Sequence, residues 1–370
     1  MKNFIYRFLF PLYFILVTPS LFSNEFSYEI IVSDIDVPWG FVFLEDNSLL
    51  ITDRKGQLIH FKNGKKIKVK GLPEIIAKNQ GGLLDIELHP NHSKNGWIYI
   101  SYSSSNEKKV GSNTSIMRFK IENNTMIEKE IIYKALPNSR RDRHYGSRIE
   151  FDNDNFLFFS IGDRGNRDIN PQSIERDGGK IYRLYDNGEI PIDNPFINNA
   201  NAKKAIYSYG HRNPQGMVIN PFTEELWIHE HGPRGGDEIN IIKKGENYGW
   251  PMASYGINYI GTKFTDKTSI AGMEDPIHYW VPSIAPSGMA FITSDRYPNS
   301  KGNLLIGSLL FEYVHMCIMK DNRVYKEERI LEGIGRVRSI REGPDGYIYI
   351  GVENLGIIKL IYNNFYFIIL

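Results

Sequence analysis

The chain has 370 residues, and its 44 Lys and Arg residues nearly balance its 43 Asp and Glu residues, giving a formal net charge of +1. This balance argues against a nucleic-acid partner held by a basic face and against a polybasic membrane anchor. Hydrophobic residues make up 41% and charged residues 24%, a globular composition that excludes extensive disorder. The single cysteine, Cys317, excludes an internal disulfide and a cysteine-based metal cluster, and its apolar neighbours place it in the core.

The first residues have the features of a secretory signal peptide. Lys2 and Arg7 are basic, residues 8–17 form an uncharged apolar run, and small and polar residues follow up to Asn24. The run is short for a membrane span, which favours a cleaved signal over an uncleaved anchor. We therefore expect residues 1–23 to be a signal peptide and residues 24–370 to form the mature domain. That domain is expected in the periplasm or outside the cell, with no membrane span after cleavage.

A two-strand unit recurs six times along the rest of the chain. In each copy a small residue opens an alternating strand, turn residues follow, and a second strand leads into another loop. The six strand pairs are expected at residues 39–43 and 48–52, 82–88 and 97–101, 146–151 and 156–161, 215–219 and 226–229, 287–292 and 303–307, and 337–341 and 347–351. A third strand often follows, at residues 57–61, 116–121, 180–184, 238–242 and 356–361.

This repeat predicts an all-β fold, a six-bladed β-propeller. Antiparallel units of three or four strands form such a ring, and the longer repeats hold loop insertions. Residues 26–33 precede the first unit and are expected to complete the last blade, which removes two exposed sheet edges. A generic β-sandwich is the alternative, but six matches to one template favour the propeller. The apolar tail, residues 365–370, is also expected to be a strand.

Polar residues gather in the loops that the repeat places at one end of the ring. In an antiparallel blade, the loop before the first strand and the loop after the second strand lie at the same end. These loops contain Gln80, His144, Asp163, several arginines and the glycine-rich segment 231–237. Because binding sites form where polar loop residues converge on a rigid scaffold, we expect a site at this mouth.

Two kinds of chemistry are suggested by these residues. His144 is the candidate general base because an imidazole titrates near neutral pH, and Asp163 is the candidate carboxylate that fixes its tautomer. The alternative is a surface histidine and a turn aspartate. Arg212, Arg336 and Arg338 are suited to an anion with several carboxylates, since guanidinium groups pair with carboxylates. Arg336 and Arg338 are two residues apart on a strand and share a face.

Two metals are compatible with the segment that begins at His229. His229 and His231 lie on one strand face and suit zinc, although no third ligand is evident. Asp237 and Glu238 lie beside a glycine-rich loop with free carbonyl groups, which suits a hard cation such as calcium better. The chain lacks the glycine-rich nucleotide-binding motifs and the G-x-S-x-G motif of serine hydrolases.

Seven motifs stand in order along nearly the whole mature chain. They are V-P-W-G at residues 37–40, Q-G-G-L-L-D at 80–85, S-I-G-D-R-G at 160–165, Y-G-H-R-N-P-Q-G at 209–216, E-H-G-P-R-G-G-D-E at 230–238, N-Y-G-W-P at 247–251 and V-P-S-I-A-P-S-G at 281–288. Together they resemble the glucose/sorbosone dehydrogenase family, in particular its soluble PQQ-dependent aldose sugar dehydrogenases. The resemblance implies a six-bladed propeller that oxidises an aldose sugar at its anomeric hydroxyl, with PQQ, calcium and a diffusible electron acceptor.

The resemblance also implies roles for individual residues. His144 matches the general base that takes the proton of the sugar hydroxyl as hydride passes to PQQ. Asp163 matches the carboxylate partner of that base, and Arg212 matches the residue beside the reacting PQQ carbonyl. The residues that match cofactor contacts are Gln80, Arg212, Asn213, Ser283, Arg336 and Arg338. The residues that match calcium ligands are Gly232 and Pro233 beside PQQ, and Glu238 and Tyr248 at a second site.

Two features depart from the family pattern. Many members have a lysine shortly after Gly-Ser/Ala-Leu in blade five, but here Leu310 follows Leu309. The missing cation predicts weaker PQQ binding. Arg143 precedes the base where glucose-oxidising relatives can carry an acid, so the resemblance does not imply the choice of sugar.

Two other functions are compatible with the same fold. One is a family propeller without redox activity that binds carbohydrate or protein, which the missing lysine favours. The other is a calcium-dependent hydrolase or lactonase, which needs carboxylates and Asn at the central channel. The expected mouth is rich in Arg and His instead, which favours the dehydrogenase.

Overall fold

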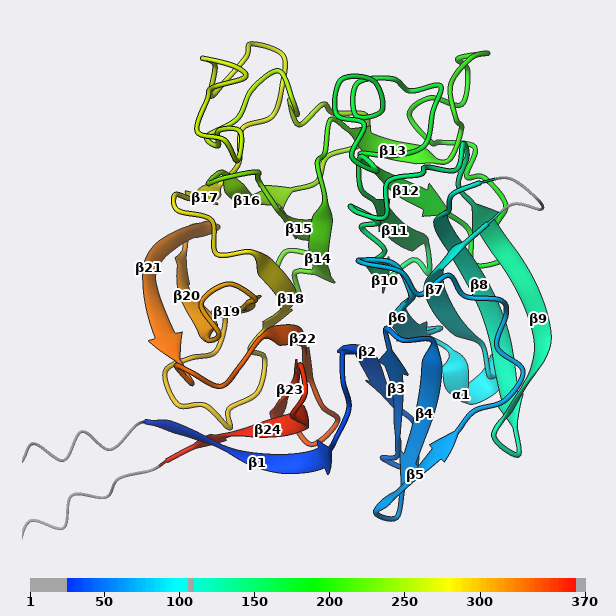
Figure 1. Ribbon diagram of the computed structural model, residues 1–370. Coiled ribbons are helices and arrows are strands. Elements are labelled where there is room, and N and C mark those ends of the chain that lie inside the picture. The colour runs from blue at the N-terminus through cyan, green and yellow to red at the C-terminus, as the bar shows by residue number, and fades with distance from the viewer. Residues whose placement is uncertain (1–24, 106–109, 364–370) are drawn as a thin grey trace, which may run out of the picture.

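Six four-stranded antiparallel sheets surround a central axis in the computed structural model, which describes residues 25–105 and 110–363 (Figure 1). In five of the sheets the four strands are consecutive in the chain. The protein is therefore a six-bladed β-propeller, and the expected fold class is confirmed. The expected signal peptide and the expected strand at residues 365–370 lie outside the described residues.

The blades follow one another in chain order. Blades one to three contain β2 (Pro38–Phe43), β3 (Leu49–Asp53), β4 (Gln57–Lys62), β5 (Lys65–Lys68), β6 (Leu83–Leu88), β7 (Ile98–Ser104), β8 (Asn113–Glu122), β9 (Thr125–Lys134), β10 (Ile149–Phe151), β11 (Leu157–Ile161), β12 (Lys180–Leu184) and β13 (Ile206–Tyr209). Blades four to six contain β14 (Pro214–Ile219), β15 (Leu226–Glu230), β16 (Asp237–Ile241), β17 (His278–Trp280), β18 (Pro286–Phe291), β19 (Leu304–Ser308), β20 (Val314–Lys320), β21 (Arg323–Ile330), β22 (Val337–Glu342), β23 (Ile348–Val352), β24 (Gly356–Tyr362) and β1 (Phe26–Ser33). The short helix α1 (His92–Asn95) lies between β6 and β7.

The ring is closed by the two ends of the described chain. β1 forms the outer strand of the sixth blade and pairs with β24, with Phe26 opposite Tyr362 and Ser33 opposite Gly356. Figure 1 shows these two strands, blue and red, side by side. Pairing the N-terminal strand with the C-terminal blade satisfies backbone groups that an open ring would leave at an edge. The expected role of residues 26–33 is thus confirmed.

The hydrophobic core is divided among the contacts between neighbouring blades. Val42 and Leu50 of blade one, for example, cluster with Ile86 and Ile100 of blade two. Equivalent clusters lie between every other adjacent pair, including the sixth and first blades. Cys317 is fully buried in the cluster between blades four and five, as expected. Successive side chains of a strand point to opposite faces, so the inner strands, which are buried at nearly every position, pack against the neighbouring blade on each side.

The innermost strands bend where they approach the mouth of the ring. Five of the six begin with an irregular register against the second strand, as at Pro38/Gly40 and Pro286/Met289. Such bulges redirect the chain. Gly288 allows the inner strands to approach closely, because a Cβ added there would lie 2.4 Å from the backbone nitrogen of Ile340. The bends carry the loops that precede each blade toward the central axis.

The outer strands of blades one to five are parts of the blades that the repeat did not predict. β5 is exposed along its whole length, and its sequence K-K-I-K has no buried face. The long repeats contain insertions between β11 and β13 and between β16 and β17, which extend beyond the blades in Figure 1. Among the described residues, no helix has the length and apolar character needed to cross a membrane.

Candidate active site

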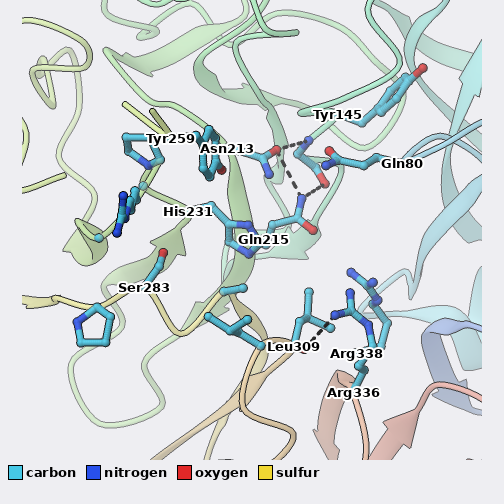
Figure 2. A pocket seen from close by; sticks show the side chains of 18 of the residues that line it. Gln80, Tyr145, Asn213, Gln215, His231, Tyr259, Ser283, Leu309, Arg336 and Arg338 are labelled. Atoms are coloured by element: carbon cyan, nitrogen blue, oxygen red, sulfur yellow. Dashed lines mark hydrogen bonds between the residues drawn. The ribbon is translucent and has the colours of Figure 1, made fainter. Parts of the chain in front are cut away.

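A cavity of about 1020 Å³ opens at the mouth of the ring. The predicted cofactor contacts that line it are Gln80, Asn213, Ser283, Arg336 and Arg338 (Figure 2). The predicted metal ligands that line it are Gly232 and Pro233. Among the described residues, its lining contains four arginines and no Asp or Glu. The cavity is therefore suited to an anionic ligand.

His144, which is partly buried, and Asp163, which is fully buried, form a pair beside this cavity. His144 Nδ1 lies 2.7 Å from Asp163 Oδ1, and the main-chain amide of His144 donates to Oε1 of the cavity residue Gln80 at 2.7 Å. The other oxygen of Asp163 accepts from Trp250 Nε1 at 3.0 Å. His144 has a φ of +55°, a left-handed conformation that is uncommon for a residue with a side chain. The surrounding contacts thus hold the imidazole in a strained and defined position.

The environment of this pair keeps the imidazole neutral. Burial, followed by the positive charge of Arg212, lowers the pKa of His144 to about 4. Burial alone would raise the pKa of Asp163, but the hydrogen bond with His144 and the charge of Arg212 bring it below its ordinary value. An ionised Asp163 only accepts hydrogen bonds, so His144 carries its proton on Nδ1. Nε2 then has a free lone pair, and no described residue forms a hydrogen bond with it.

Arg212 links the His144 pair to the cavity wall. Its guanidinium donates to the carbonyl of His231 at 2.9 Å and lies 3.5 Å from the hydroxyl of Tyr259, and both residues line the cavity. The main-chain amide of Arg212 donates to the carboxylate of Glu230. Arg212 is largely buried, so its charge acts on the site with little screening by solvent.

The loop that carries Asp163 is anchored by a buried amine. Lys180 is fully buried, and its Nζ donates to the carbonyls of Pro171 at 3.0 Å and Gly178 at 2.8 Å, and also to that of Asn170. Asn170 Nδ2 in turn donates to the carbonyl of Asp163 at 3.0 Å. Burial lowers the pKa of Lys180 to about 7. The sequence analysis did not identify this support, because Lys180 opens an otherwise ordinary third strand.

Arg336 and Arg338 lie on one side of the cavity but are not free cations. Arg336 Nε donates to Glu353 Oε2 at 2.8 Å, and Arg338 Nε donates to Glu353 Oε1 at 3.1 Å. Arg336 also donates to the carbonyl of Leu309 at 2.8 Å. The common partner Glu353 agrees with the expectation that Arg336 and Arg338 share a face. Glu353, which the sequence analysis did not identify, offsets part of their charge.

Asp237 organises the loops at the mouth instead of facing a cation. One of its oxygens accepts from the amide of Gly232 at 2.7 Å and from the hydroxyl of Ser283, and the other accepts from the amides of Ile284 and Ala285 at 2.8 Å. All four donors compete with a metal for the same lone pairs. The expectation that Asp237 helps bind calcium is therefore corrected, because its carboxylate joins the glycine-rich loop to the loop before β18.

Glu238 lies in a second oxygen-rich environment. It is opposite Glu230 in the pairing of β15 with β16, and burial together with the charge of Glu230 raises its pKa well above the usual range. Asn240 Oδ1 is buried nearby without a hydrogen-bond partner among the described residues, while its amide group lies 3.4 Å from Glu230. Tyr248 donates its hydroxyl to the carbonyl of Ile241 at 2.6 Å, and its ring stacks on His211.

The contacts of His229, in β15, and of His231, in the loop that follows, do not support a zinc site. His229 Nε2 contacts the carbonyl of Ser287, and His231 Nε2 lies 2.6 Å from the carbonyl of Pro286. Within residues 25–105 and 110–363, no group of three or more His, Cys, Asp or Glu side chains is arranged to hold a metal ion. Both imidazoles instead tie blade four to blade five.

Comparison with known proteins identifies the family. Residues 35–359 match the family model described as Glucose / Sorbosone dehydrogenase. The chain belongs to the glucose/sorbosone dehydrogenase family. The family member Aldose sugar dehydrogenase YliI of Escherichia coli is 41% identical over 329 residues, covering 87% of this chain and 88% of the relative.

Solved structures of the family have the same architecture. The soluble aldose sugar dehydrogenase of Escherichia coli in its apo form superimposes with a TM-score of 0.88 at 39% identity, covering 91% of this chain and 100% of that one. The PQQ-bound aldose sugar dehydrogenase of Streptomyces coelicolor superimposes with a TM-score of 0.74 at 25% identity, covering 92% and 99%. The protein is thus a dehydrogenase of this family, an oxidoreductase.

The cavity of this dehydrogenase also contains residues that the sequence analysis overlooked. Arg54 and Tyr259 line it, together with Arg234 of the expected segment 231–237. Arg54 follows the second strand of blade one, so the repeat itself places it at the mouth. Tyr259 lies in the insertion after β16, where no repeat applies. Leu310 lines the cavity and is 55% exposed, so the position where relatives have a lysine faces the site without a charge.

Proposed function

We propose that the protein is a PQQ- and calcium-dependent aldose dehydrogenase in which His144 is the general base. The His144–Asp163 pair is the observation that carries this proposal: a neutral imidazole with an available Nε2 lies beside a cavity rich in arginine. PQQ, when bound, would supply the quinone carbonyl that accepts hydride from the anomeric carbon of the sugar.

The residues of the chain would then act on the anomeric hydroxyl. His144 Nε2 accepts its proton, so that the C–O bond gains double-bond character as the C–H bond breaks, and the aldose becomes a lactone. Asp163 stabilises the imidazolium that forms and keeps the ring oriented through Nδ1. The guanidinium of Arg212 is placed to stabilise negative charge that develops on an oxygen in the site.

The lining of the cavity suits an acidic cofactor. Its lining offers arginine charge, the amides of Gln80, Asn213 and Gln215, and no described carboxylate that would repel PQQ acids. Asn213 Oδ1 accepts from the amide of Gly146 at 3.2 Å, and Gln215 donates to the carbonyl of Gly146 at 3.1 Å, so both side chains are held in place (Figure 2). The PQQ-bound Streptomyces coelicolor relative supports the same cofactor here.

Hard oxygen donors are present for calcium at two places. A Cβ added at Gly232 would lie 2.2 Å from the carbonyl oxygen of Gly235 and 2.3 Å from that of Gly236, so carbonyl groups are crowded in this loop. Gly232 and Pro233 would hold the ion near PQQ through their carbonyls. Glu238 and the carbonyl of Tyr248 would hold a second ion, and the unpaired Asn240 Oδ1 is an oxygen of the type that calcium prefers.

Reconstitution tests this proposal directly. Purified apoprotein is incubated with PQQ and calcium, and reduction of an artificial electron-accepting dye is followed with a panel of aldoses. Activity is expected only when both PQQ and calcium are present. Turnover that needs neither, or a protein that binds no PQQ, would reject the proposal. A diffusible acceptor fits the open mouth, and the dye takes its place in the assay.

A propeller that binds ligand without redox activity is the second candidate. Leu310 favours it, because the position that carries a lysine in many relatives is apolar and exposed here. PQQ binding without dye reduction by any aldose would support this candidate. The hydrolase alternative is less compatible, since the described lining of the cavity has no carboxylate.

We also propose that the protein is exported to the periplasm or secreted. The support is the basic and apolar pattern of residues 1–23. Fractionation of cells that produce the full chain, with N-terminal sequencing of the product, tests this. Cytoplasmic protein with an intact N-terminus would contradict export.

A further inference from the structure

Arg54 occupies a fixed place between the first two blades. It directly follows β3, its amide donates to the carbonyl of Val37 at 3.1 Å, and its carbonyl accepts from the amide of Leu83 at 3.2 Å. Its side chain is half-buried and lines the cavity. The backbone is thus held by both blades, and the residue forms part of the wall of the space where an acidic ligand would lie.

Three other arginines of the site already have partners. Arg336 and Arg338 share Glu353, and Arg212 donates to the carbonyl of His231. The guanidinium of Arg54, in contrast, forms no hydrogen bond or ion pair with any residue that the structure describes. Arg234 is also unpaired within that part of the chain, but it is exposed at the rim, where solvent screens its charge.

Arg54 and Arg338 are close enough for their charges to interact. Burial, and to a smaller extent the charge of Arg54, lowers the pKa of Arg338 to about 10, against the opposing effect of Glu353. Arg54, Arg336 and Arg338 bring three positive charges to this part of the cavity, and Glu353 brings one negative charge. The net charge there is therefore positive. A bound carboxylate would relieve that repulsion and gain a charge-assisted hydrogen bond.

We infer that Arg54 binds a carboxylate group of the cofactor and supplies the positive charge that Leu310 does not. This inference rests on the proposed function, because the anion is PQQ. It assigns a cofactor contact to a blade-one residue and explains how the cavity accommodates an acidic ligand without the blade-five lysine.

The test compares charge removal at two positions in the same cavity. Arg54→Gln and the matched control Arg234→Gln are titrated with PQQ in the presence of calcium, and binding is followed by quenching of intrinsic protein fluorescence. Gln keeps the Cβ and Cγ of Arg54, which pack beside Gly82, and Arg54→Lys retains the charge. Circular dichroism of each variant without PQQ verifies that the fold is intact.

Arg54→Gln is expected to weaken PQQ binding roughly tenfold to a hundredfold and to reduce its dependence on salt. Arg54→Lys should recover part of this loss, and Arg234→Gln should change the affinity only a few-fold. Wild-type affinity in Arg54→Gln, or a larger loss in Arg234→Gln, would overturn the inference while leaving the proposed function intact. Absence of PQQ binding by the wild-type protein would reject both.

Discussion

The guanidinium of Arg148 lies 3.1 Å from the carboxylate of Asp85 at the centre of the ring. The same guanidinium donates to the carbonyls of Gln215 at 2.6 Å, Arg338 at 2.9 Å and Trp39 at 3.3 Å, and it stacks on the Trp39 ring at 4.1 Å. One buried cation of blade three therefore contacts blades one, two, four and six. It lies directly beneath the cavity, of which Trp39 and Arg338 form part.

Arg148→Met is expected to destabilise the protein by about 3–5 kcal/mol, because it leaves the Asp85 carboxylate buried without its partner. Chemical denaturation followed by circular dichroism measures the free energy of unfolding. Arg323→Met on the exposed strand β21 is the control and should change it by less than about 0.5 kcal/mol. Equal stability of Arg148→Met and the control would show that the central ion pair does not support the ring.

His144→Ala should abolish most of the activity while the protein still folds and binds PQQ. The expected loss in turnover is about 10²–10⁴-fold, the usual contribution of a positioned general base. Asp163→Asn should also reduce turnover, and the loss in the double variant should be clearly smaller than the two single losses combined, because the pair acts as one unit. Near wild-type dye reduction by PQQ-loaded His144→Ala would exclude this base.

The pH dependence of the reaction should reflect the low pKa of His144. Since burial and Arg212 lower this pKa to about 4, the imidazole is neutral and able to accept a proton throughout the neutral range. The value of kcat/KM should therefore rise with pH through about 4 and be independent of this group above about 6. A profile that still rises steeply between pH 6 and 8 would indicate a base with an ordinary imidazole pKa or a different group.

Calcium should stabilise the PQQ-loaded protein, because an ion that binds only the folded state raises its stability by mass action. At a free concentration of 100 times Kd, the gain is about 2.7 kcal/mol per site. Differential scanning fluorimetry with added calcium and with a chelator measures the shift in Tm. Glu238→Gln should reduce this shift and leave the site at Gly232 and Pro233. Identical melting curves with calcium and with chelator would argue against both sites.

Leu310→Lys should tighten PQQ binding by placing a cation at an exposed position of the cavity wall. A charge-assisted contact contributes roughly 1.5–3 kcal/mol. The gain in PQQ affinity should be larger in the Arg54→Gln background than in the wild type. In the wild type, Arg54 would already pair with a carboxylate of the bound PQQ. Fluorescence titration of the four combinations gives the coupling between the two positions. Leu310→Gln serves as the uncharged control, and no gain with lysine in either background would contradict the prediction.

The repeat in the sequence determined the ring, its six blades and its closure. The two inner strands of each blade are rich in apolar residues because both of their faces are buried, so β2, β3 and their equivalents were placed correctly. The outer strands were mostly not predicted, since strands such as β5 have no buried face to impose a pattern. The repeat also brought Gln80, His144, Asp163 and Arg212 to one end of the ring, because chain direction alternates within a blade.

Only the tertiary structure decided which of these polar groups are paired. Asp237 is occupied by four donors from two loops, and Glu353 joins Arg336 and Arg338. Arg54, which looks like any loop arginine in the sequence, is left without a partner in the described chain. Asp237 accepts from donors up to 48 residues away along the chain, and Glu353 joins arginines that lie 17 and 15 residues before it. These pairings depend on side-chain geometry in the folded ring, which no local spacing of residues specifies.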